Sequence, residues 1–282
     1  MEIISSPVQM TALASTALAK GRVIGLVPTM GFFHEGHLAL LKRAGELADF
    51  VVVSLFVNPL QFGPGEDLAR YPRDFARDCR LAEAAGAHVL FAPEAGDMYP
   101  QPPLSRVVVA GLSEGLCGAS RPGHFEGVAT VVAKLFNIVK PGLAVFGKKD
   151  LQQLAVIRRM VADLNWDTKI VGHPIVREAD GLAMSSRNIY LSARERCSAL
   201  CLHQAISHAR TRVRQGLTGA DVLLEEVRSL LLERQGVTID YVALVDGGNL
   251  APCTELRDGV VLVMAIRIGA TRLIDNDELF AA

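Results

Sequence analysis

Cysteine is scarce in this chain of 282 residues, and the five that occur are odd in number and scattered. A small secreted scaffold would carry a dense, even set of cysteines, so a reducing, cytoplasmic setting is expected. No apolar run approaches the length of about 20 residues that spans a membrane. The N-terminal segment is interrupted by Ser and Thr and has no basic residue before its apolar part, so we expect neither a signal peptide nor a membrane partner.

An excess of charge is also missing. The formal net charge is −1 and charged residues make up 21% of the chain, which argues against a broad nucleic-acid or membrane surface. Hydrophobic residues make up 50%, the balance of a folded globular protein. Any anionic ligand must therefore be held by a local cluster of basic groups.

Several catalytic signatures are absent as well. The chain has no Walker A pattern, no GxGxxG after its first expected strand, no GxSxG and no obvious pair of catalytic carboxylates. These absences disfavour a P-loop ATPase and a typical nicotinamide dehydrogenase. A site rich in cations and hydrogen-bond donors, without its own nucleophile, suits phosphate chemistry driven by positioning and charge stabilisation.

The stretch VPTMGFFHEGHLALL, residues 27–41, is the most informative part of the chain. A strand is expected to end in a glycine turn, after which a helix opens with His34 and His37 on one face. The first turn of a helix presents unpaired N–H groups and the positive end of the dipole, which suits a phosphate. Surface histidines near a helix start remain the alternative on this stretch alone.

Strand and helix patterns alternate through the first part of the chain, which predicts a Rossmann-like α/β domain with a parallel sheet over residues 1–175. From Ala193 two helices are followed by alternating strands, which predicts a smaller C-terminal α+β domain over residues 176–282. The expected strands cover 23–27, 50–57, 88–92, 106–109, 143–146, 169–176, 237–245 and 260–266. The expected helices cover 9–20, 35–48, 75–85, 128–139, 193–215 and 219–235, with another beginning near 151.

Further hydrogen-bond donors lie at loops of the expected sheet. Lys148 and Lys149 follow a strand in GKKD, and two serines precede Arg187 in GLAMSSRN; such groups bind phosphate readily. Arg121 and His124 are either solvent-exposed charges or phosphate contacts, and the residues leave the two interpretations even. The Cys and His residues between 197 and 208 match no zinc spacing, so core cysteines are the preferred interpretation.

Seven motifs together carry a family resemblance: VPTMG with HEGH, FVNPLQF, YPRD, RPGHFEGVATVV, FGKKDLQQLAVIRRMV and DGLAMSSRN. The H-x-G-H element resembles the phosphate-binding signature of nucleotidyltransferase and class I synthetase-type (HIGH-type) Rossmann folds. The whole set, in order and at similar spacing, resembles the pantothenate synthetase family, also called pantoate–β-alanine ligases. The resemblance covers nearly the whole chain, most densely residues 27–188.

The resemblance implies an AMP-forming ligase that makes a C–N (amide) bond in pantothenate and coenzyme A biosynthesis. ATP would activate (R)-pantoate as a pantoyl-adenylate with release of pyrophosphate, and β-alanine would then displace AMP. It also implies Mg²⁺, with no metal ligand assigned to the protein, and a homodimer whose other partners are small-molecule substrates rather than nucleic acid.

The resemblance also implies site residues. His37 matches the catalytic proton donor, assisted by His34 and Lys149, while Gln61 matches a contact of pantoate and β-alanine and Gln153 a contact of pantoate. The implied ATP contacts are Met30, Gly31, Phe32, Phe33, His34, Glu35, Gly36, His37, Gly147, Lys148, Lys149, Asp150, Val176, Met184, Ser185, Ser186 and Arg187. Two positions depart from the usual pattern: Phe33 stands where leucine is common, and Lys148 where acidic or neutral residues are frequent.

Two rival functions follow from the same residues. A nucleotidyltransferase that joins a nucleotide to a phosphorylated acceptor would share H-x-G-H and the sheet, but would not require Gln61 and Gln153 as a pair. A nucleotide-binding regulatory module would keep the ATP contacts and show no turnover. The position of 184–187 just past the domain boundary near Val176 is where a hinged lid would bring phosphate ligands in late.

Overall fold

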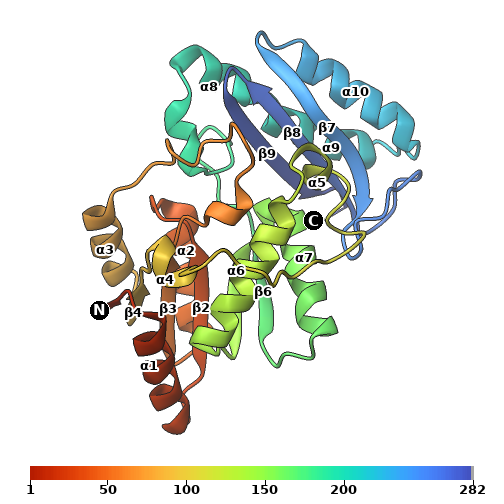
Figure 1. Cartoon of the computed structure of the whole chain (residues 1–282). Helices are drawn as coiled ribbons and strands as arrows, with labels where there is room; N and C mark the ends of the chain where they lie inside the picture. Colours follow the sequence, from red (N-terminus) through yellow and green to blue (C-terminus); the bar gives the residue numbers. More distant parts are fainter. Residues whose placement is uncertain (281–282) are drawn as a thin grey trace. The chain divides into compact units, whose positions relative to one another are not determined.

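The computed structural model describes residues 1–280, whose contacts divide into two compact units (Figure 1). The first unit comprises Met1–Lys148 and Val156–Pro174. The second comprises Lys149–Ala155 and the chain from Ile175 onward. A short segment after the first unit's fifth strand therefore belongs, by its contacts, with the C-terminal part of the chain.

Six parallel strands form the sheet of the first unit, in the order β1-β4-β3-β2-β5-β6. Their bounds are β1 Glu2–Ile4, β2 Ile24–Thr29, β3 Phe50–Leu55, β4 Val89–Phe91, β5 Leu143–Gly147 and β6 Lys169–His173. In β3, FVVVSL, five of six residues are buried, because β-branched and apolar side chains on both faces are covered by helices. The expected Rossmann-like α/β class is confirmed.

Helices connect these strands and cover both faces of the sheet. Their bounds are α1 Pro7–Ala19, α2 Glu35–Leu47, α3 Phe75–Ala84, α4 Ala95–Met98, α5 Cys117–Ser120, α6 His124–Val139 and α7 Leu151–Asp163. Val51 and Val53 join one core cluster with residues of α2 and α3, whereas the alternate residue Val52 is buried outside that cluster. Side chains alternate between the two faces of the sheet along a strand, which explains this division. The helices α1 and α6 contact each other, and both contact β2.

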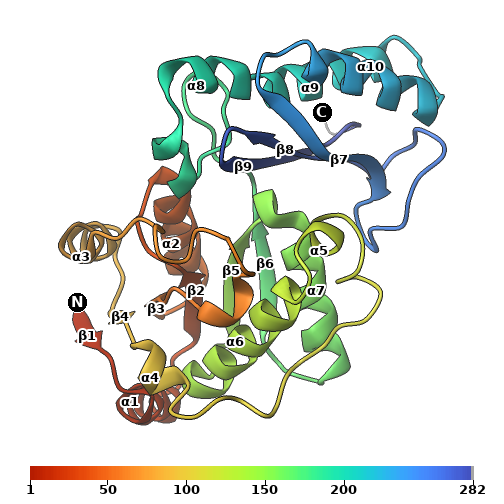
Figure 2. The ribbon, with the colours of Figure 1, turned by 45° about the horizontal axis from the view of Figure 1, so that its top comes forward.

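The second unit contains a three-stranded antiparallel sheet, β7-β8-β9, with three helices in contact with it. Its elements are α8 Ala193–Ala199, α9 Cys201–Arg214, α10 Ala220–Leu232, β7 Val237–Asp246, β8 Val260–Ile268 and β9 Thr271–Glu278. In β8 eight of nine residues are buried, as expected for the central strand. Figure 2 shows α9 and α10 along this sheet.

The expected strand at 106–109 is wrong. Within residues 1–280 this segment pairs with no strand; the Val107 N–H instead donates to Thr130 Oγ1 on α6, at 3.0 Å. Val108 is 65% exposed. The β-branched run therefore lies beside a helix, where its backbone bonds to a side chain.

Two strands were not expected from the sequence. β1 is only three residues long and pairs with β4 at the edge of the sheet. In β9 the polar residues Asp275 and Asn276 are buried, so the sequence lacks the alternation of apolar and polar residues that predicts a strand. Arg177 binds both carboxylate oxygens of Asp275, at 2.7 and 3.0 Å, which compensates its burial.

Several element ends also differ from expectation. α6 begins at His124, four residues before the expected start, and β6 ends at His173 because Pro174 follows. The expected helix 193–215 is interrupted at Leu200, which separates α8 from α9. Of its cysteines, Cys201 is buried, as expected of a core residue, whereas Cys197 is exposed.

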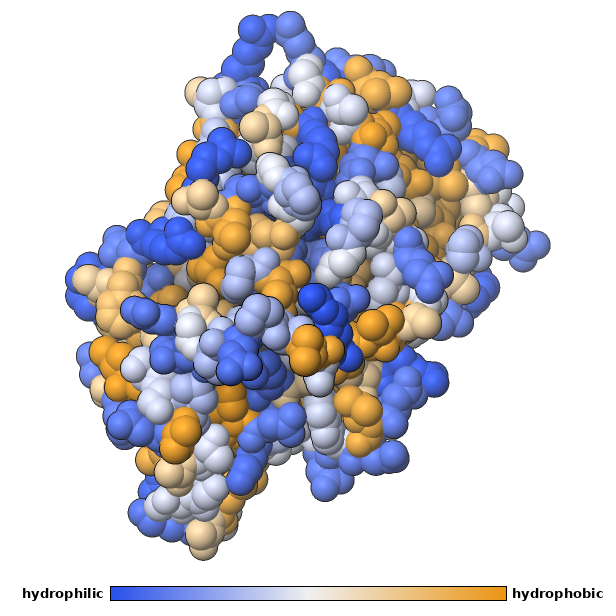
Figure 3. Space-filling model, in the orientation of Figure 1, coloured by the Kyte–Doolittle hydropathy of each residue, from blue (hydrophilic) through white to orange (hydrophobic). Residues whose placement is uncertain are grey.

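No helix within residues 1–280 combines the length and hydropathy needed to cross a membrane. The face drawn in Figure 3 mixes hydrophilic and hydrophobic residues.

Candidate active site

The turn after β2 occupies the position where open α/β sheets place ligands. From β2 the chain continues to β3 and β4 on one side, while β5 and β6 lie on its other side, so the direction of winding reverses beside β2. Ligands bind outside the carboxyl ends of strands at such a switch point. The segment 30–37 starts there and opens α2 (Figure 1).

The two histidines form the N-terminal cap of α2. His34 Nδ1 accepts a hydrogen bond from the Gly36 N–H at 3.1 Å, and His37 Nδ1 accepts one from the His34 N–H at 3.3 Å. Their rings stack with centroids 4.0 Å apart. This is a capping box built from two imidazoles, which satisfies helix N–H groups that have no carbonyl partner.

These bonds determine where each ring carries its proton. Because Nδ1 of both His34 and His37 accepts from a backbone N–H, each neutral ring is protonated at Nε2. Nε2 is therefore the hydrogen-bond donor of each ring, and a neutral donor avoids repulsion by the positive end of the helix. The pair suits an anion that accepts hydrogen bonds.

Gln61 is oriented by Asn58 in a one-turn 3₁₀ helix, Pro59–Gln61, after β3. Asn58 Nδ2 donates to Gln61 Oε1 at 3.1 Å, so the Gln61 amide nitrogen faces the other way and contacts Met30 Sδ at 3.3 Å. Thioether sulfur is a weak acceptor, so this N–H group retains donor strength for a ligand. The structure thus brings the predicted residues Met30 and Gln61 together.

Asn58 and Tyr99 support Gln61, and the sequence did not single them out for this role. Tyr99 Oη donates to Asn58 Oδ1 at 2.9 Å, and Asn58 also donates to the Gly127 carbonyl at 3.1 Å. Burial raises the pKa of Tyr99 to about 12, which keeps its hydroxyl a donor. The one available signal was Asn58 itself, a polar residue at the end of a buried strand.

Arg121 and His124 hold the backbone of Gln61. Arg121 Nε and Nη2 bind the two carboxylate oxygens of Glu66 at 2.7 and 2.6 Å, and Nη2 also donates to the Gln61 carbonyl at 3.3 Å. Although burial acts to raise it, the bonds from Arg121 lower the pKa of Glu66. Arg121 is therefore not a charge left in solvent.

His124 completes the same cluster. Its Nδ1 lies 2.8 Å from the Gln61 carbonyl oxygen, and its Nε2 lies 2.9 Å from Arg121 Nη1. A carbonyl only accepts and a guanidinium only donates, so both contacts are satisfied by the neutral ring protonated at Nδ1. Glu66, Arg121 and His124 together position the peptide that carries Gln61.

A second group of the predicted contacts gathers in the second unit around Lys149. Its Nζ donates to the Met184 carbonyl at 2.8 Å, and its own carbonyl accepts from Asn276 Nδ2 at 2.8 Å. Burial lowers the pKa of Lys149, against the opposing effects of Asp150 and Asp275. A cation with a single carbonyl partner is incompletely neutralised, which favours an anionic ligand.

The loop that supplies Met184 is held as a tight hairpin. The Met184 N–H donates to the Val176 carbonyl at 3.0 Å, and Arg177 pairs with Ala183 in an isolated bridge. Ser185 Oγ accepts from the Arg187 N–H at 3.3 Å and caps the 3₁₀ helix Ser186–Tyr190. Val176, Met184 and the Ser185–Arg187 turn therefore lie together with Lys149.

For the other predicted residues, the structure gives the element to which each belongs and how far it is exposed. Gln153 is half-buried in the first turn of α7, and Gly147 ends β5. Glu35, Lys148 and Asp150 are exposed. Phe33 is fully buried in the core, so its side chain is structural.

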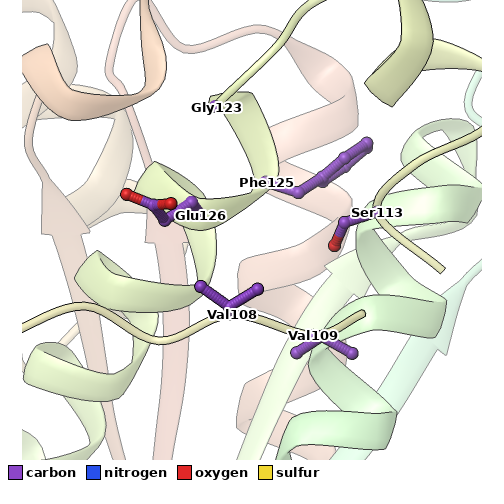
Figure 4. Close-up of a pocket in the computed structure, with 6 residues that line it drawn as sticks. All are labelled: Val108, Val109, Ser113, Gly123, Phe125 and Glu126. Atoms are coloured by element: carbon purple, nitrogen blue, oxygen red, sulfur yellow. The ribbon is translucent and has the colours of Figure 1, made fainter. Parts of the chain in front are cut away.

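Over residues 1–280 no group of three or more His, Cys, Asp or Glu side chains is arranged to hold a metal ion. A pocket beside the start of α6, shown in Figure 4, is lined by Val108, Val109, Ser113, Gly123, Phe125 and Glu126. Its volume, about 160 Å³, is below the roughly 300–1,000 Å³ of ordinary small-molecule sites.

Comparison with known proteins gives one consistent family. The family model described as pantoate-β-alanine ligase matches residues 2–278. A pantothenate synthetase of Heliobacterium modesticaldum is 55% identical over 98% of both chains. Among solved structures, pantothenate synthetase from Thermus thermophilus is similar over 100% of both chains, with 46% identity and a TM-score of 0.95.

A third relative carries ligands. Pantoate-β-alanine ligase from Francisella tularensis, described as complexed with β-γ ATP and β-alanine, is 33% identical, with a TM-score of 0.82. The match covers 100% of this chain and 99% of that one.

Proposed function

The chain belongs to the pantoate-β-alanine ligase family, and on that premise we propose that it condenses pantoate with β-alanine in two steps, the first of which consumes ATP. In the first, a pantoate carboxylate oxygen attacks the α-phosphorus of ATP and pyrophosphate leaves. In the second, the amine of β-alanine attacks the acyl carbon of the adenylate, AMP leaves, and the new amide nitrogen loses a proton. Neither step needs a nucleophile from the enzyme.

The observation that carries this proposal is the capped histidine pair. The Nε2–H groups of His34 and His37 would donate to phosphate oxygens as negative charge grows on them, and His37 would act as the proton donor. Donors already fixed by a helix cap need little reorganisation during the reaction. We propose Met30–His37 as ATP contacts.

Lys149 and Arg187 would supply positive charge to ATP. The ammonium of Lys149 has one carbonyl partner and a lowered pKa, so it would gain from a phosphate oxygen. The further proposed ATP contacts are Gly147, Lys148, Asp150, Val176, Met184, Ser185 and Ser186.

Gln61 and Gln153 are the proposed contacts of pantoate, and Gln61 also of β-alanine. The orientation given by Asn58 presents amide N–H donors of Gln61, which suit a carboxylate or hydroxyl oxygen. A neutral amide binds the nucleophilic carboxylate without adding a cation that would over-stabilise the ground state.

Magnesium is proposed to arrive with ATP. Mg²⁺ usually keeps several waters and binds through substrate phosphates with one or two carboxylates, so a protein cage is not required. When bound, the ion would neutralise charge on the departing pyrophosphate.

We also propose a cytoplasmic homodimer. All five cysteines are free, which suits a reducing compartment.

Leu104 is 99% exposed and Val108 is 65% exposed on an extended segment that pairs with no strand in residues 1–280. An exposed apolar segment with strand-forming residues is suited to pairing with a second copy.

Isotope exchange between pyrophosphate and ATP tests the first step. Exchange that requires pantoate but not β-alanine is expected, and its absence in folded protein that otherwise binds ATP would refute the ligase. A nucleotidyltransferase would exchange only with its own phosphorylated acceptor and not with pantoate, and a regulatory module would not exchange.

Two variants test the proposed charge stabilisation. His37→Ala and Lys149→Ala are each expected to slow pantoate-dependent exchange by about 10²-fold or more, the scale for removing one preorganised stabilising group. His208→Ala, which loses a surface contact to Glu226, and Lys140→Ala, an exposed lysine, are the matched controls. Near-normal exchange in either site variant would reject the role of that residue.

A further inference from the structure

We propose that Asp78 is a positioning residue that holds the backbone of Phe32 and Phe33 and thereby sets the geometry of the His34–His37 pair. The inference rests on the proposed role of His37 in adenylation. Asp78 lies on α3, and α3 contacts α2 (Figure 2). In the sequence, Asp78 is 46 residues away from Phe32.

Both oxygens of the Asp78 carboxylate are committed to the turn. Oδ2 accepts from the Phe32 N–H and Oδ1 from the Phe33 N–H, each at 2.7 Å. Asp78 is 1% exposed, so water does not compete for these bonds. A bidentate, buried carboxylate on two successive N–H groups restrains the peptide more than one neutral hydrogen bond does.

The restrained backbone is in a conformation that needs support. Phe32 has φ 52° and Gly31 has φ 84°, and a non-glycine residue in the left-handed region costs on the order of 1 kcal/mol or more. This conformation aims two consecutive N–H groups at one carboxylate. A Cβ atom placed on Gly31 would lie 3.0 Å from Asp78 Oδ2 and 3.1 Å from Leu55 Cγ, so a side chain there would crowd the carboxylate.

The restraint reaches the histidines through Phe33. Its ring is fully buried in the core, and its centroid lies 5.5 Å from that of His37. The next residue, His34, donates its N–H to His37 Nδ1. A shift of the Phe32–Phe33 peptide therefore moves both members of the cap.

The raised pKa of Asp78 makes its contribution to stability depend on pH. Burial raises its pKa, although the two N–H donors act to lower it. A carboxyl with a raised folded-state pKa contributes stability that is fully present below the unfolded pKa and is lost as pH rises through the folded value. The contribution of Asp78 to stability is therefore greater at low pH than above its folded-state pKa, whereas the ionised carboxylate accepts through both oxygens.

Asp78→Asn tests the inference. The amide keeps one acceptor and turns an NH₂ group toward the other backbone N–H, so one of the two bonds is lost. The expected result is pantoate-dependent exchange slowed about 10- to 100-fold, mainly in kcat, the scale for a misplacement near 1 Å. Asp246→Asn is the matched control, because Asp246 Oδ1 likewise accepts from two backbone N–H groups, those of Gly248 and Asn249.

A double variant separates positioning from a structural role. If Asp78 acts through the histidine pair, adding Asp78→Asn to His37→Ala slows exchange no more than about twofold beyond His37→Ala alone, because coupled sites are not additive. A full multiplicative loss, or normal exchange by Asp78→Asn beside slow His37→Ala, would overturn the inference. Normal exchange by His37→Ala would instead refute the proposed role of His37 and, with it, this inference.

Gly31→Ala probes the same turn from the other side, should Asp78→Asn fold poorly. The added Cβ presses on Asp78 Oδ2, and a similar loss in kcat is expected. Gly86→Ala is its control, since Gly86 has φ 85° but nothing within 4 Å of the added Cβ. Equal kcat in these two glycine variants would contradict the inference.

Discussion

At the scale of the residue, Lys149 is the group whose charge depends most directly on its surroundings. Burial lowers its pKa from the ordinary value of 10.5, while nearby Asp150 and Asp275 act against this shift. A lysine is charged below its pKa, so the ammonium is lost as pH rises through a value below 10.5.

We expect kcat/KM for pantoate-dependent exchange to fall on the alkaline side in this range, since kcat/KM reports groups of the free enzyme. Lys149→Arg should move that fall to higher pH, because guanidinium stays charged, although the overall rate should drop. A pH profile of both proteins, with Lys140→Arg as control, measures this. An alkaline limb that does not move would assign the titration to another group.

At the scale of the element, the first turns of α6 position the 3₁₀ turn that carries Gln61. The two elements are in contact, and a Cβ atom on Gly127 would lie 2.4 Å from the Leu60 carbonyl oxygen and 2.7 Å from the Gln61 Cα atom. Glycine at this position therefore allows the helix and the turn to approach closely.

Gly127→Ala should push the turn away and raise KM for pantoate or β-alanine by about tenfold or more, the scale expected when a substrate-positioning group is displaced, with a smaller effect on KM for ATP. Gly45→Ala is the control, because Gly45 is also helical and nothing lies within 4 Å of its added Cβ; there alanine should stabilise by about 0.5–1 kcal/mol. Steady-state kinetics and thermal unfolding compare the two. A uniform rise in all three KM values for Gly127→Ala would contradict the positioning of Gln61.

At the scale of the whole molecule, the proposed homodimer depends on the segment that was expected to be a strand. Val108→Lys places a charge on this exposed apolar segment and should shift the dimer toward the monomer. Val222→Lys on α10, where Val222 is 50% exposed, is the matched control. Sedimentation at several concentrations measures the change; a dimer equally stable in both variants would place the interface elsewhere.

Much of the first unit could be predicted from local patterns. Strands such as β3 are continuous apolar runs, and α2 and α3 begin directly after N-cap residues that the sequence shows. The bounds expected for these elements therefore agree with the observed ones within a few residues. The pattern misled at 106–109, because β-branched residues also suit an extended segment that bonds to a helix side chain. It missed β9, because buried Asp275 is compensated by Arg177, 98 residues away.

The two histidines, the glycine turn, the lysine pair and the glutamines are visible in the sequence, because they lie in short motifs at strand ends. Their protonation pattern and support are not. Asp78 accepts from residues 45 and 46 positions away, and Tyr99 orients Asn58 from 41 positions away.

The sequence by itself therefore determined the α/β class and the chemical types of the site residues, since periodicity and motifs are properties of neighbouring positions. Only the tertiary structure decided that both imidazoles donate through Nε2, that Phe32 adopts a left-handed backbone and that a buried carboxylate holds it there. The physical reason is that hydrogen bonds between distant residues depend on the three-dimensional packing of helices on the sheet, which no local pattern records.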